Sequence, residues 1–255
     1  MEIAAIIFLV IFVTILTVVL FNLFYKDIFK RVTDIFCSLA VFIFLWPLWL
    51  ILAILVRTKL GKPVLFTQIR PGKNGKLFKM YKFRSMTNET DDKGNLLPDE
   101  VRLTKFGKWL RKTSLDEMPE AINILKGDMS VIGPRPLLVK DYVFFDTEIM
   151  KRQDIRPGLS GLAQVEGRNN ISWEDKFKYD LEYCKKVGFF YDTKLVFRSF
   201  FKAFIKKENV DRDGFATDED YGDYLLRTKR ISKKTYSDKI ILSMEIIKNG
   251  KKHLL

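Results

Sequence analysis

Histidine is almost absent from this 255-residue chain: the one histidine, His253, lies near the C-terminus. Its scarcity argues against a histidine general base and against a histidine-rich metal site. The two cysteines, Cys37 and Cys184, provide neither a disulfide framework nor the spacing of zinc ligands. Both common nucleotide-binding patterns, the Walker A loop and a Gly-x-Gly-x-x-Gly after a strand, are also missing. Catalysis would therefore rest on carboxylates, Lys, Arg or Tyr, or on a metal held by oxygen ligands.

Apolar and basic residues are both abundant. Hydrophobic residues make up 47% of the chain, which includes 22 Phe, and the formal net charge is +13. A chain that is both apolar and basic favours a partner that is oily and anionic, which describes membrane phospholipid better than nucleic acid. No nucleic-acid-binding motif accompanies the charge, so we expect no nucleic-acid partner.

The first apolar segment, residues 3–24, contains no charge and is long enough to span a bilayer as a helix. It lacks the basic start and the small-residue cleavage site of a signal peptide. We therefore predict a retained transmembrane helix within residues 1–27. Basic residues follow directly, beginning with Lys26, and the positive-inside tendency places the chain after this helix in the cytoplasm.

A second uncharged segment, residues 35–56, has basic residues on both flanks, so both flanks favour the cytoplasm. Pro47 lies near its middle and interrupts the helical hydrogen bonds. The part before it, residues 35–46, would form a half-helix of about 18 Å. That is too short for a membrane core of about 30 Å. We predict a re-entrant hairpin of two half-helices at residues 28–58, which enters and leaves on the cytoplasmic face. A spanning helix with a proline kink is the alternative.

The rest of the chain is predicted to be mainly helical with one small, strongly cationic β-hairpin at residues 63–86. The Phe-rich, basic segment 195–207 suits an amphipathic helix in the headgroup plane, or an ordinary core helix. We expect a cytoplasmic catalytic domain at residues 59–207 and a charged extension at residues 208–255. In that extension Asp211-Arg212-Asp213 matches a metal-binding pattern, which we attribute to chance. Other helices are predicted at about residues 102–112, 116–126, 173–187 and 237–248.

Two adjacent carboxylates, Asp116 and Glu117, follow a basic pair and a Thr-Ser step. Ser114 and Glu117 fit a capping box, in which the acids would only complement the positive end of a helix. Pro119 would then fall past the first turn, whereas a helix start nearer Asp116 puts it inside the first turn. Either start leaves Asp116 near a helix N-terminus, where a carboxylate stays ionised beside an anionic substrate.

These acids have a chemistry that requires no histidine. Adjacent carboxylates can share Mg²⁺, and an aspartate can attack phosphorus to form an acyl-phosphate. Pro134 and Pro136 restrict the backbone on both sides of Arg135, so this loop can aim one guanidinium at a fixed point. Since arginine binds phosphate through paired hydrogen bonds, the combination suggests phosphoryl transfer on a phosphate substrate.

Four segments, in the same order, resemble the bacterial sugar transferase family, the monotopic polyprenyl-phosphate phosphoglycosyl transferases. The resemblance covers roughly residues 28–205. It implies transfer of a sugar-1-phosphate from a UDP-sugar to polyprenyl phosphate, usually undecaprenyl phosphate, with release of UMP. It also implies a re-entrant anchor in the bacterial plasma (inner) membrane, with the catalytic domain on the cytoplasmic face. The segments are residues 82–86 (KFRSM), 110–119 (LRKTSLDEMP), 127–136 (GDMSVIGPRP) and 156–165 (RPGLSGLAQV).

The resemblance also implies roles for individual residues. Asp116 matches the nucleophile that forms a covalent phosphosugar intermediate, and Glu117, with Asp116, would hold Mg²⁺ (or Mn²⁺). Two features depart from the family: the smallest members lack residues 3–24, and Trp46 stands before Pro47 where a small polar residue is common. The expected phosphate and nucleotide contacts are Lys82, Arg84, Arg111, Arg135 and Arg168.

Some questions stay open at this point. A non-catalytic basic membrane scaffold of a polysaccharide assembly machine is the alternative to an enzyme. The sequence names neither the sugar nor the downstream pathway, and it leaves open whether the chain forms a homodimer.

Overall fold

The computed structural model of the chain describes residues 2–167, 171–204 and 219–249. Helices account for most of these residues, and the described strands form two small two-stranded sheets, in agreement with the predicted mainly α class. Short 3-10 or π turns carry the label η. The elements are α1 (Glu2–Phe24), η1 (Tyr25–Phe29), α2 (Lys30–Lys59), β1 (Leu65–Pro71), η2 (Lys73–Gly75), β2 (Leu77–Phe83), α3 (Asp99–Arg102), α4 (Lys105–Lys112), η3 (Leu115–Glu117), α5 (Glu120–Lys126), β3 (Ser130–Ile132), α6 (Val139–Tyr142), α7 (Thr147–Met150), η4 (Lys151–Gln153), β4 (Gly158–Ser160), α8 (Leu162–Glu166), α9 (Trp173–Lys185), α10 (Phe189–Phe204), α11 (Tyr221–Arg227) and α12 (Lys233–Asn249).

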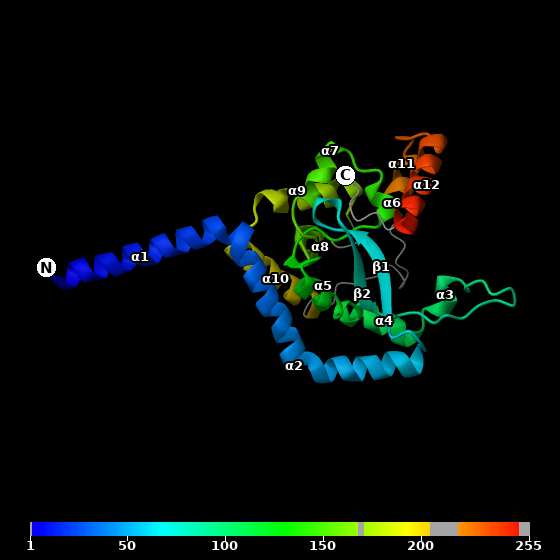
Figure 1. Cartoon of the computed structure of the whole chain (residues 1–255), viewed down its shortest axis with the longest axis horizontal. Helices are drawn as coiled ribbons and strands as arrows, with labels where there is room; N and C mark the ends of the chain where they lie inside the picture. Colours follow the sequence, from blue (N-terminus) through cyan, green and yellow to red (C-terminus); the bar gives the residue numbers. More distant parts are fainter. Residues whose placement is uncertain (1, 168–170, 205–218, 250–255) are drawn as a thin grey trace.

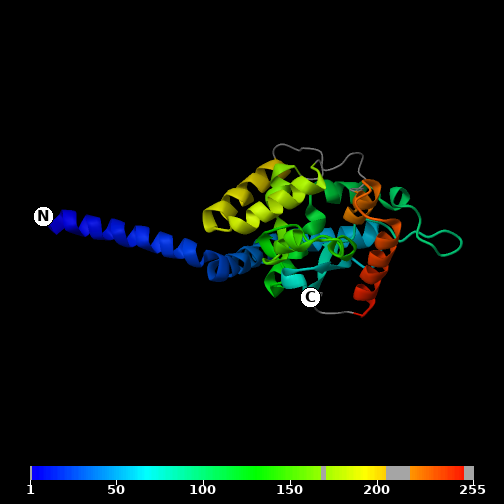
Figure 2. The same cartoon turned by 90° about the horizontal axis from the view of Figure 1, so that it is seen from above.

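Helix α1 is the apolar helix predicted for residues 3–24, and none of its residues is buried. Figures 1 and 2 both show it extending away from the rest of the molecule. Within the described ranges, α1 and α2 are the two helices long and apolar enough to cross a membrane. An apolar helix that buries nothing within the protein needs another apolar environment, which a bilayer provides.

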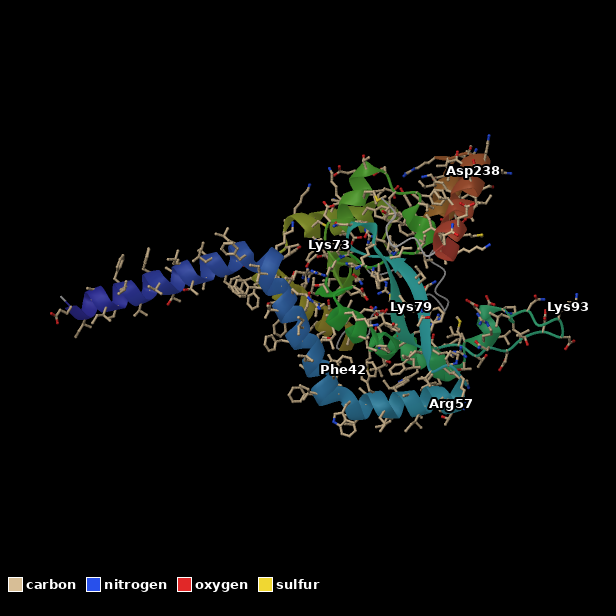
Figure 3. All side chains as sticks on the ribbon, in the orientation of Figure 1. Phe42, Arg57, Lys73, Lys79, Lys93 and Asp238 are labelled. Carbon is tan, nitrogen blue, oxygen red and sulfur yellow. The ribbon has the colours of Figure 1, made fainter. Side chains whose placement is uncertain are left out.

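Helix α2 is continuous through Pro47, so the predicted break at Trp46-Pro47 is wrong as a helix end. The helix is instead sharply bent (Figure 1), and Figure 3 places Phe42 at the bend and Arg57 toward its far end. A proline inside a helix removes one hydrogen bond, and its ring clashes with the carbonyl four residues earlier, here that of Ile43. These effects bend α2 into two arms, residues 30–42 and 47–59, without ending it.

The first arm of α2 is hydrogen-bonded to α5. Ser38 Oγ donates to the carbonyl of Ala121 at 2.7 Å. Arg31 donates to the carbonyls of Ile124 and Leu125 near the end of α5, where helix carbonyls lack partners within the helix. Helix α2 and the helix that follows the Asp116-Glu117 pair are therefore directly connected.

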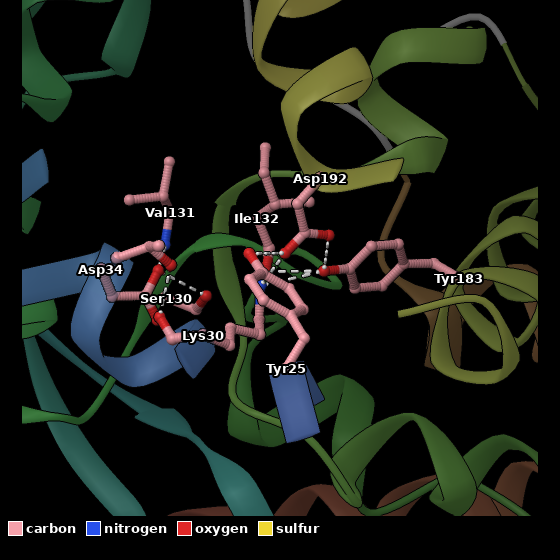
Figure 4. Close-up of polar contacts among 9 residues, drawn as sticks. Tyr25, Lys30, Asp34, Ser130, Val131, Ile132, Tyr183 and Asp192 are labelled. Carbon is pink, nitrogen blue, oxygen red and sulfur yellow. Dashed lines mark hydrogen bonds and ion pairs between the residues drawn. The ribbon is translucent and has the colours of Figure 1, made fainter. Parts of the chain in front are cut away.

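A buried polar cluster attaches the N-terminal end of the first arm to the core (Figure 4). Asp34 accepts hydrogen bonds from β3, including one of 2.9 Å from Ser130 Oγ. Lys30 forms an ion pair with Asp192 of α10 and donates to the hydroxyl of Tyr183 at 3.1 Å. Tyr183 in turn donates to Asp192 at 2.7 Å. Buried charges are costly unless they are paired in this way, so the cluster specifies where α2 meets the domain.

The second arm packs on the other side of the same domain. Leu52 and Val56 are buried in an apolar cluster with Phe83 of β2 and Leu110 of α4. Both arms of α2 thus contact one globular unit, and the bend lies between the two contacts.

The predicted hairpin at residues 63–86 is confirmed as the antiparallel pair β1–β2. Its turn contains Asn74 in the left-handed region (φ 54°), which asparagine tolerates better than most residues. Asn123 of α5 holds β2 in place: its side chain accepts from the N–H of Tyr81 (3.0 Å) and donates to the carbonyl of Lys79 (2.8 Å). The hairpin and α5 are therefore directly hydrogen-bonded to each other.

The second sheet is the parallel pair β3–β4, which the sequence did not predict. Three-residue strands show no periodicity that a sequence pattern could reveal. Their close approach depends on glycine, because a Cβ at Gly158 would lie 2.0 Å from the backbone nitrogen of Gly133. Gly133 and Gly158 thus allow two chain segments to approach at their backbones.

Several predicted helix limits need correction. The helix expected at residues 102–112 is divided into α3 and α4, because Thr104 caps α4 by accepting from the N–H of Gly107. The helix expected at residues 116–126 is the short turn η3 followed by α5. Helix α9 is confirmed, while α10 and α12 begin earlier than predicted.

The charged extension contributes to the core. Tyr221 and Leu225 of α11, a helix that was not predicted, are buried against Phe145 and Phe177. Helices α11 and α12 pack beside α6, at a distance from α1 (Figure 1). The Asp211-Arg212-Asp213 pattern lies outside the described residues.

Candidate active site

Asp116 and Glu117 lie in the 3-10 turn η3, ahead of α5. Ser114, just before the turn, adopts the left-handed conformation (φ 56°) and makes no capping hydrogen bond, so the capping-box interpretation is wrong. Helix α5 begins only at Glu120, directly after Pro119. A proline at this point suits a helix start, since its missing N–H would have no partner within the helix. The reversal at Ser114 turns Asp116 inward, where it is 8% exposed.

Two cations from separate elements converge on Glu117. Lys82, near the end of β2, places its ammonium 2.7 Å from Glu117 Oε1. Arg135, in the loop after β3, donates to the same oxygen from Nη2 at 2.7 Å. Lys82 also lies 3.3 Å from Glu120 Oε1. We refer to Lys82, Asp116, Glu117, Glu120 and Arg135 as the carboxylate cluster.

The other predicted cations are Arg111, Arg84 and Arg168, and they do not all lie at the acid pair. The charge of Arg111 acts on Asp116, and its Nε donates to Ser85 Oγ at 2.9 Å, which fixes the side chain across the hairpin end. Arg84 is directed elsewhere, because its guanidinium donates to the carbonyl of Lys62 at 2.6 Å. Arg168 lies outside the described residues. The structure therefore brings Lys82, Arg111 and Arg135 together with the acid pair and leaves Arg84 apart.

The two adjacent acids have opposite electrostatic surroundings. Burial, followed by the negative charge of Glu117, raises the pKa of Asp116 to about 6, against the lowering effects of Lys82, Arg111 and Arg135. Burial acts on Glu117 as well, but Arg135 and Lys82 hold its pKa well below the ordinary range. Glu117 is thus a permanent anion bound between two cations. With a pKa of about 6, Asp116 is more readily protonated than Glu117 and is still mostly ionised near neutral pH.

Asp116 stays ionised for a different reason from the one that the sequence predicted. A helix N-terminus was expected to keep it charged, whereas α5 begins four residues later and the cations of the cluster supply the compensating charge. A buried carboxylate with a moderately raised pKa is poorly hydrated and still mostly ionised near neutral pH. Both properties suit a nucleophile.

Sequence reasoning missed Glu120. Its side chain is 2% exposed, burial raises its pKa to about 7, and Lys82 is its cationic neighbour. The available signal was its position directly after Pro119, one turn from Glu117, so that both acids face β2. A buried third acid gives Lys82 two partners and restricts where its ammonium can lie.

The acids also provide candidate metal ligands. Within the described ranges no group of three or more potential ligands is assembled for a metal. Mg²⁺ does not require one, since it is commonly held by one or two carboxylates, several waters and substrate phosphates. Both cations contact Oε1 of Glu117, which leaves Oε2 of Glu117 and the carboxylate of Asp116 as oxygen donors. This donor chemistry fits Mg²⁺.

A family model described as bacterial sugar transferase matches residues 25–206, which include the whole carboxylate cluster. The chain belongs to the bacterial sugar transferase family. Helices α1, α11 and α12 of this sugar transferase lie outside the matched residues.

Three relatives illustrate the match. The chain is 44% identical over 192 residues to a Bacillus subtilis protein named uncharacterized sugar transferase EpsL, covering 75% of this chain and 95% of that protein. It is 41% identical over 190 residues to the UDP-glucose:undecaprenyl-phosphate glucose-1-phosphate transferase of Klebsiella pneumoniae, covering 71% of this chain and 41% of that protein. It is 34% identical over 187 residues to the undecaprenyl-phosphate galactose phosphotransferase of Salmonella typhimurium, covering 67% and 39%. This sugar transferase therefore spans nearly all of the first relative and about two fifths of the other two.

Proposed function

We propose that this sugar transferase moves a sugar-1-phosphate from a UDP-sugar to polyprenyl phosphate, such as undecaprenyl phosphate, and releases UMP. The observation that carries the proposal is the buried Asp116 carboxylate beside Glu117, Lys82, Arg111 and Arg135. The names of the Klebsiella and Salmonella relatives describe undecaprenyl-phosphate sugar phosphotransferases, which supports the reaction class.

In the first step, a carboxylate oxygen of Asp116 forms a bond to the phosphorus that carries the sugar. The bond from that phosphorus to the bridging oxygen of the diphosphate breaks, and UMP leaves with the electron pair. Arg135 and Arg111 would bind the phosphoryl oxygens, on which negative charge spreads in the transition state. The product of this step is an aspartyl-phosphosugar, and its formation divides the transfer into two displacements.

In the second step, an oxygen of the polyprenyl phosphate attacks the same phosphorus, and the Asp116 carboxylate is released. The product is polyprenyl-diphosphate-sugar. Mg²⁺ (or Mn²⁺) held by Glu117 and Asp116 would neutralise charge on the phosphates. Glu117 keeps its negative charge throughout, because Lys82 and Arg135 hold its pKa low.

The membrane arrangement supports the same reaction, since a lipid phosphate must reach Asp116. We propose that α2 is re-entrant: both of its arms contact one domain, whereas a straight spanning helix would separate its ends across the bilayer. Helix α10 exposes Phe197 (70%) and Phe200 (59%), which suits a helix in the headgroup plane on the cytoplasmic face of the bacterial inner membrane.

The decisive variant is Asp116→Asn, which keeps the size of the side chain and removes the nucleophilic charge. We expect UMP release to be abolished while the thermal unfolding temperature remains within a few degrees of wild type. Asp92→Asn, at an exposed loop position, is the matched control and should retain activity. Mass spectrometry of the wild type with UDP-sugar alone should find the sugar phosphate on the peptide that contains Asp116. Normal turnover by Asp116→Asn would exclude the mechanism, and no UMP from any UDP-sugar would favour the scaffold alternative.

The topology is tested separately by cysteine accessibility. In a background with Cys37→Ser and Cys184→Ser, single cysteines are introduced at residues 28–33 and 57–62 and labelled in sealed vesicles. We expect both groups to be labelled from the cytoplasmic side. Labelling from opposite faces would show that α2 spans the bilayer.

A further inference from the structure

The segment Pro134-Arg135-Pro136 carries the guanidinium that contacts Glu117, and its backbone is fixed through its carbonyls. Two of its three residues have no N–H. The carbonyl of Pro134 accepts from the N–H of Gly158 in β4 at 3.0 Å. The next two carbonyls accept from arginine side chains of distant elements. All three consecutive carbonyls are therefore engaged, two of them by arginine side chains.

Arg152 of η4 holds the carbonyl of Arg135. Its Nη2 donates to that oxygen at 2.7 Å. Its Nε and Nη2 also donate to Asp180 of α9, at 3.0 and 2.7 Å, and both side chains are 2% exposed in this ion pair. The pairing with Asp180 keeps the guanidinium in one orientation, so that its remaining donor capacity is directed at the loop.

Arg70 of β1 holds the carbonyl of Pro136. Its Nη1 donates to that oxygen at 3.1 Å, and its Nη2 donates to Gln68 Oε1 at 2.7 Å. Within the described part of the chain no carboxylate forms an ion pair with it, and its Nε is buried without a hydrogen-bond partner. Burial and the neighbouring Arg135 lower its pKa to about 10.

The position of Arg70 is unfavourable for the free energy of folding. Like charges in proximity repel, and a buried donor without a partner costs free energy. Arg70 also lines a small cavity of about 10 Å³ with Met80, Glu120, Arg135 and Pro136, so it lies next to the carboxylate cluster. An arginine in this position needs a reason beyond packing, and its bond to Pro136 supplies one.

We propose that Arg70 is a positioning residue for the transfer reaction. Arg70 holds the carbonyl of Pro136 and Arg152 holds that of Arg135. Together these hydrogen bonds keep the Arg135 guanidinium on Glu117. Only the expected effect of Arg70 on turnover rests on the proposed function. Without the hydrogen bonds from Arg70 and Arg152, the loop backbone can rotate and move the Arg135 guanidinium away from both Glu117 and the reacting phosphate.

The test is a double-mutant cycle between Arg70→Gln and Arg135→Gln in the full chain in detergent or nanodiscs. A displacement of about 1 Å near the reacting centre can cost about 100-fold in rate. We therefore expect Arg70→Gln to lower kcat/KM by about 10- to 100-fold, with the same division between kcat and KM as Arg135→Gln. In the Arg135→Gln background the same change should cost less than about twofold, because the residue through which it acts is gone.

Two controls accompany the cycle. Lys73→Gln removes an exposed cation from the same hairpin and should leave kcat/KM unchanged. The cycle is also measured as thermal unfolding temperature, where the effects of Arg70→Gln and Arg135→Gln should again be non-additive. This second readout does not require turnover, so it remains informative if the wild type releases no UMP.

The outcomes are distinct. Multiplicative losses in kcat/KM would show that Arg70 acts independently, for example by contacting substrate itself, and would overturn the proposal. Full activity of Arg70→Gln would also overturn it. If Arg70→Gln does not fold, Arg70→Lys enters the cycle under the same criteria, because lysine keeps the charge but lacks the planar fork.

Discussion

Replacing Lys82 with methionine tests the electrostatic basis of the site. The substitution keeps the length of the side chain and removes a cation that lies 2.7 Å from Glu117 and 3.3 Å from Glu120. Lys82 also lowers the pKa of Asp116, opposing the effects of burial and of Glu117. Its loss therefore raises that pKa above its value of about 6, and a smaller fraction of Asp116 is ionised at any pH near 6.

The expected magnitude follows from the ionised fraction of Asp116. An opposite charge nearby commonly lowers a carboxyl pKa by about one unit or more, so Lys82→Met should move the acid limb of kcat/KM from about pH 6 to about pH 7. The ionised fraction then falls about fivefold at pH 6 and about twofold at pH 7, and it is nearly unchanged at pH 8. A loss that persists at pH 8 measures a different contribution of Lys82, such as phosphate binding.

The assay is UMP release between pH 5 and 9 at fixed Mg²⁺, with kcat/KM measured at each pH. Lys79→Met is the matched control, because Lys79 lies on the same strand with its side chain exposed (Figure 3). The control should have the acid limb of the wild type. An acid limb in Lys82→Met at or below the wild-type position would refute the assignment of Lys82 as one of the cations that keep Asp116 ionised.

Two further predictions concern the fold and the metal. Asp180→Asn leaves Arg152 buried without its counter-ion, which should cost about 3–5 kcal/mol and lower the unfolding temperature by about 6–20 °C. Glu148→Gln, at an exposed pair with Lys151, should have little effect, and equal shifts would contradict the reasoning. Glu117→Gln should raise the Mg²⁺ concentration for half-maximal activity by about tenfold or more, and an unchanged Mg²⁺ titration would show that Glu117 does not bind the metal.

Local sequence patterns were sufficient where an element is stabilised by its own residues. The hairpin at residues 63–86 was predicted correctly because β-favouring segments flank a turn cluster. The apolar helices α1 and α2 were equally evident from length and composition. The bend in α2 was predicted in position but not in form, because proline disrupts a helix without dictating whether it ends.

Long-range contacts explain the errors. The strands β3 and β4 exist only because Gly133 and Gly158 let two backbones approach, and no periodicity marks so short a pair. Glu120 became part of the site because α5 packs against β2, which depends on Asn123. Arg84 was expected at the site from the family resemblance; it follows the end of β2, and its guanidinium donates to the carbonyl of Lys62, a contact that only the fold creates.

The sequence by itself determined the family, the apolar N-terminal helices and the residue types available for chemistry, because motifs and composition are local properties. Only the tertiary structure showed that the two acids differ in electrostatic surroundings, with the pKa of Asp116 raised and Glu117 held as a permanent anion. Asp116 and Glu117 are neighbours with similar intrinsic acidity, and their pKa values separate only because two cations from distant segments reach one of them. Charge interactions depend on distance in space, and the fold sets that distance.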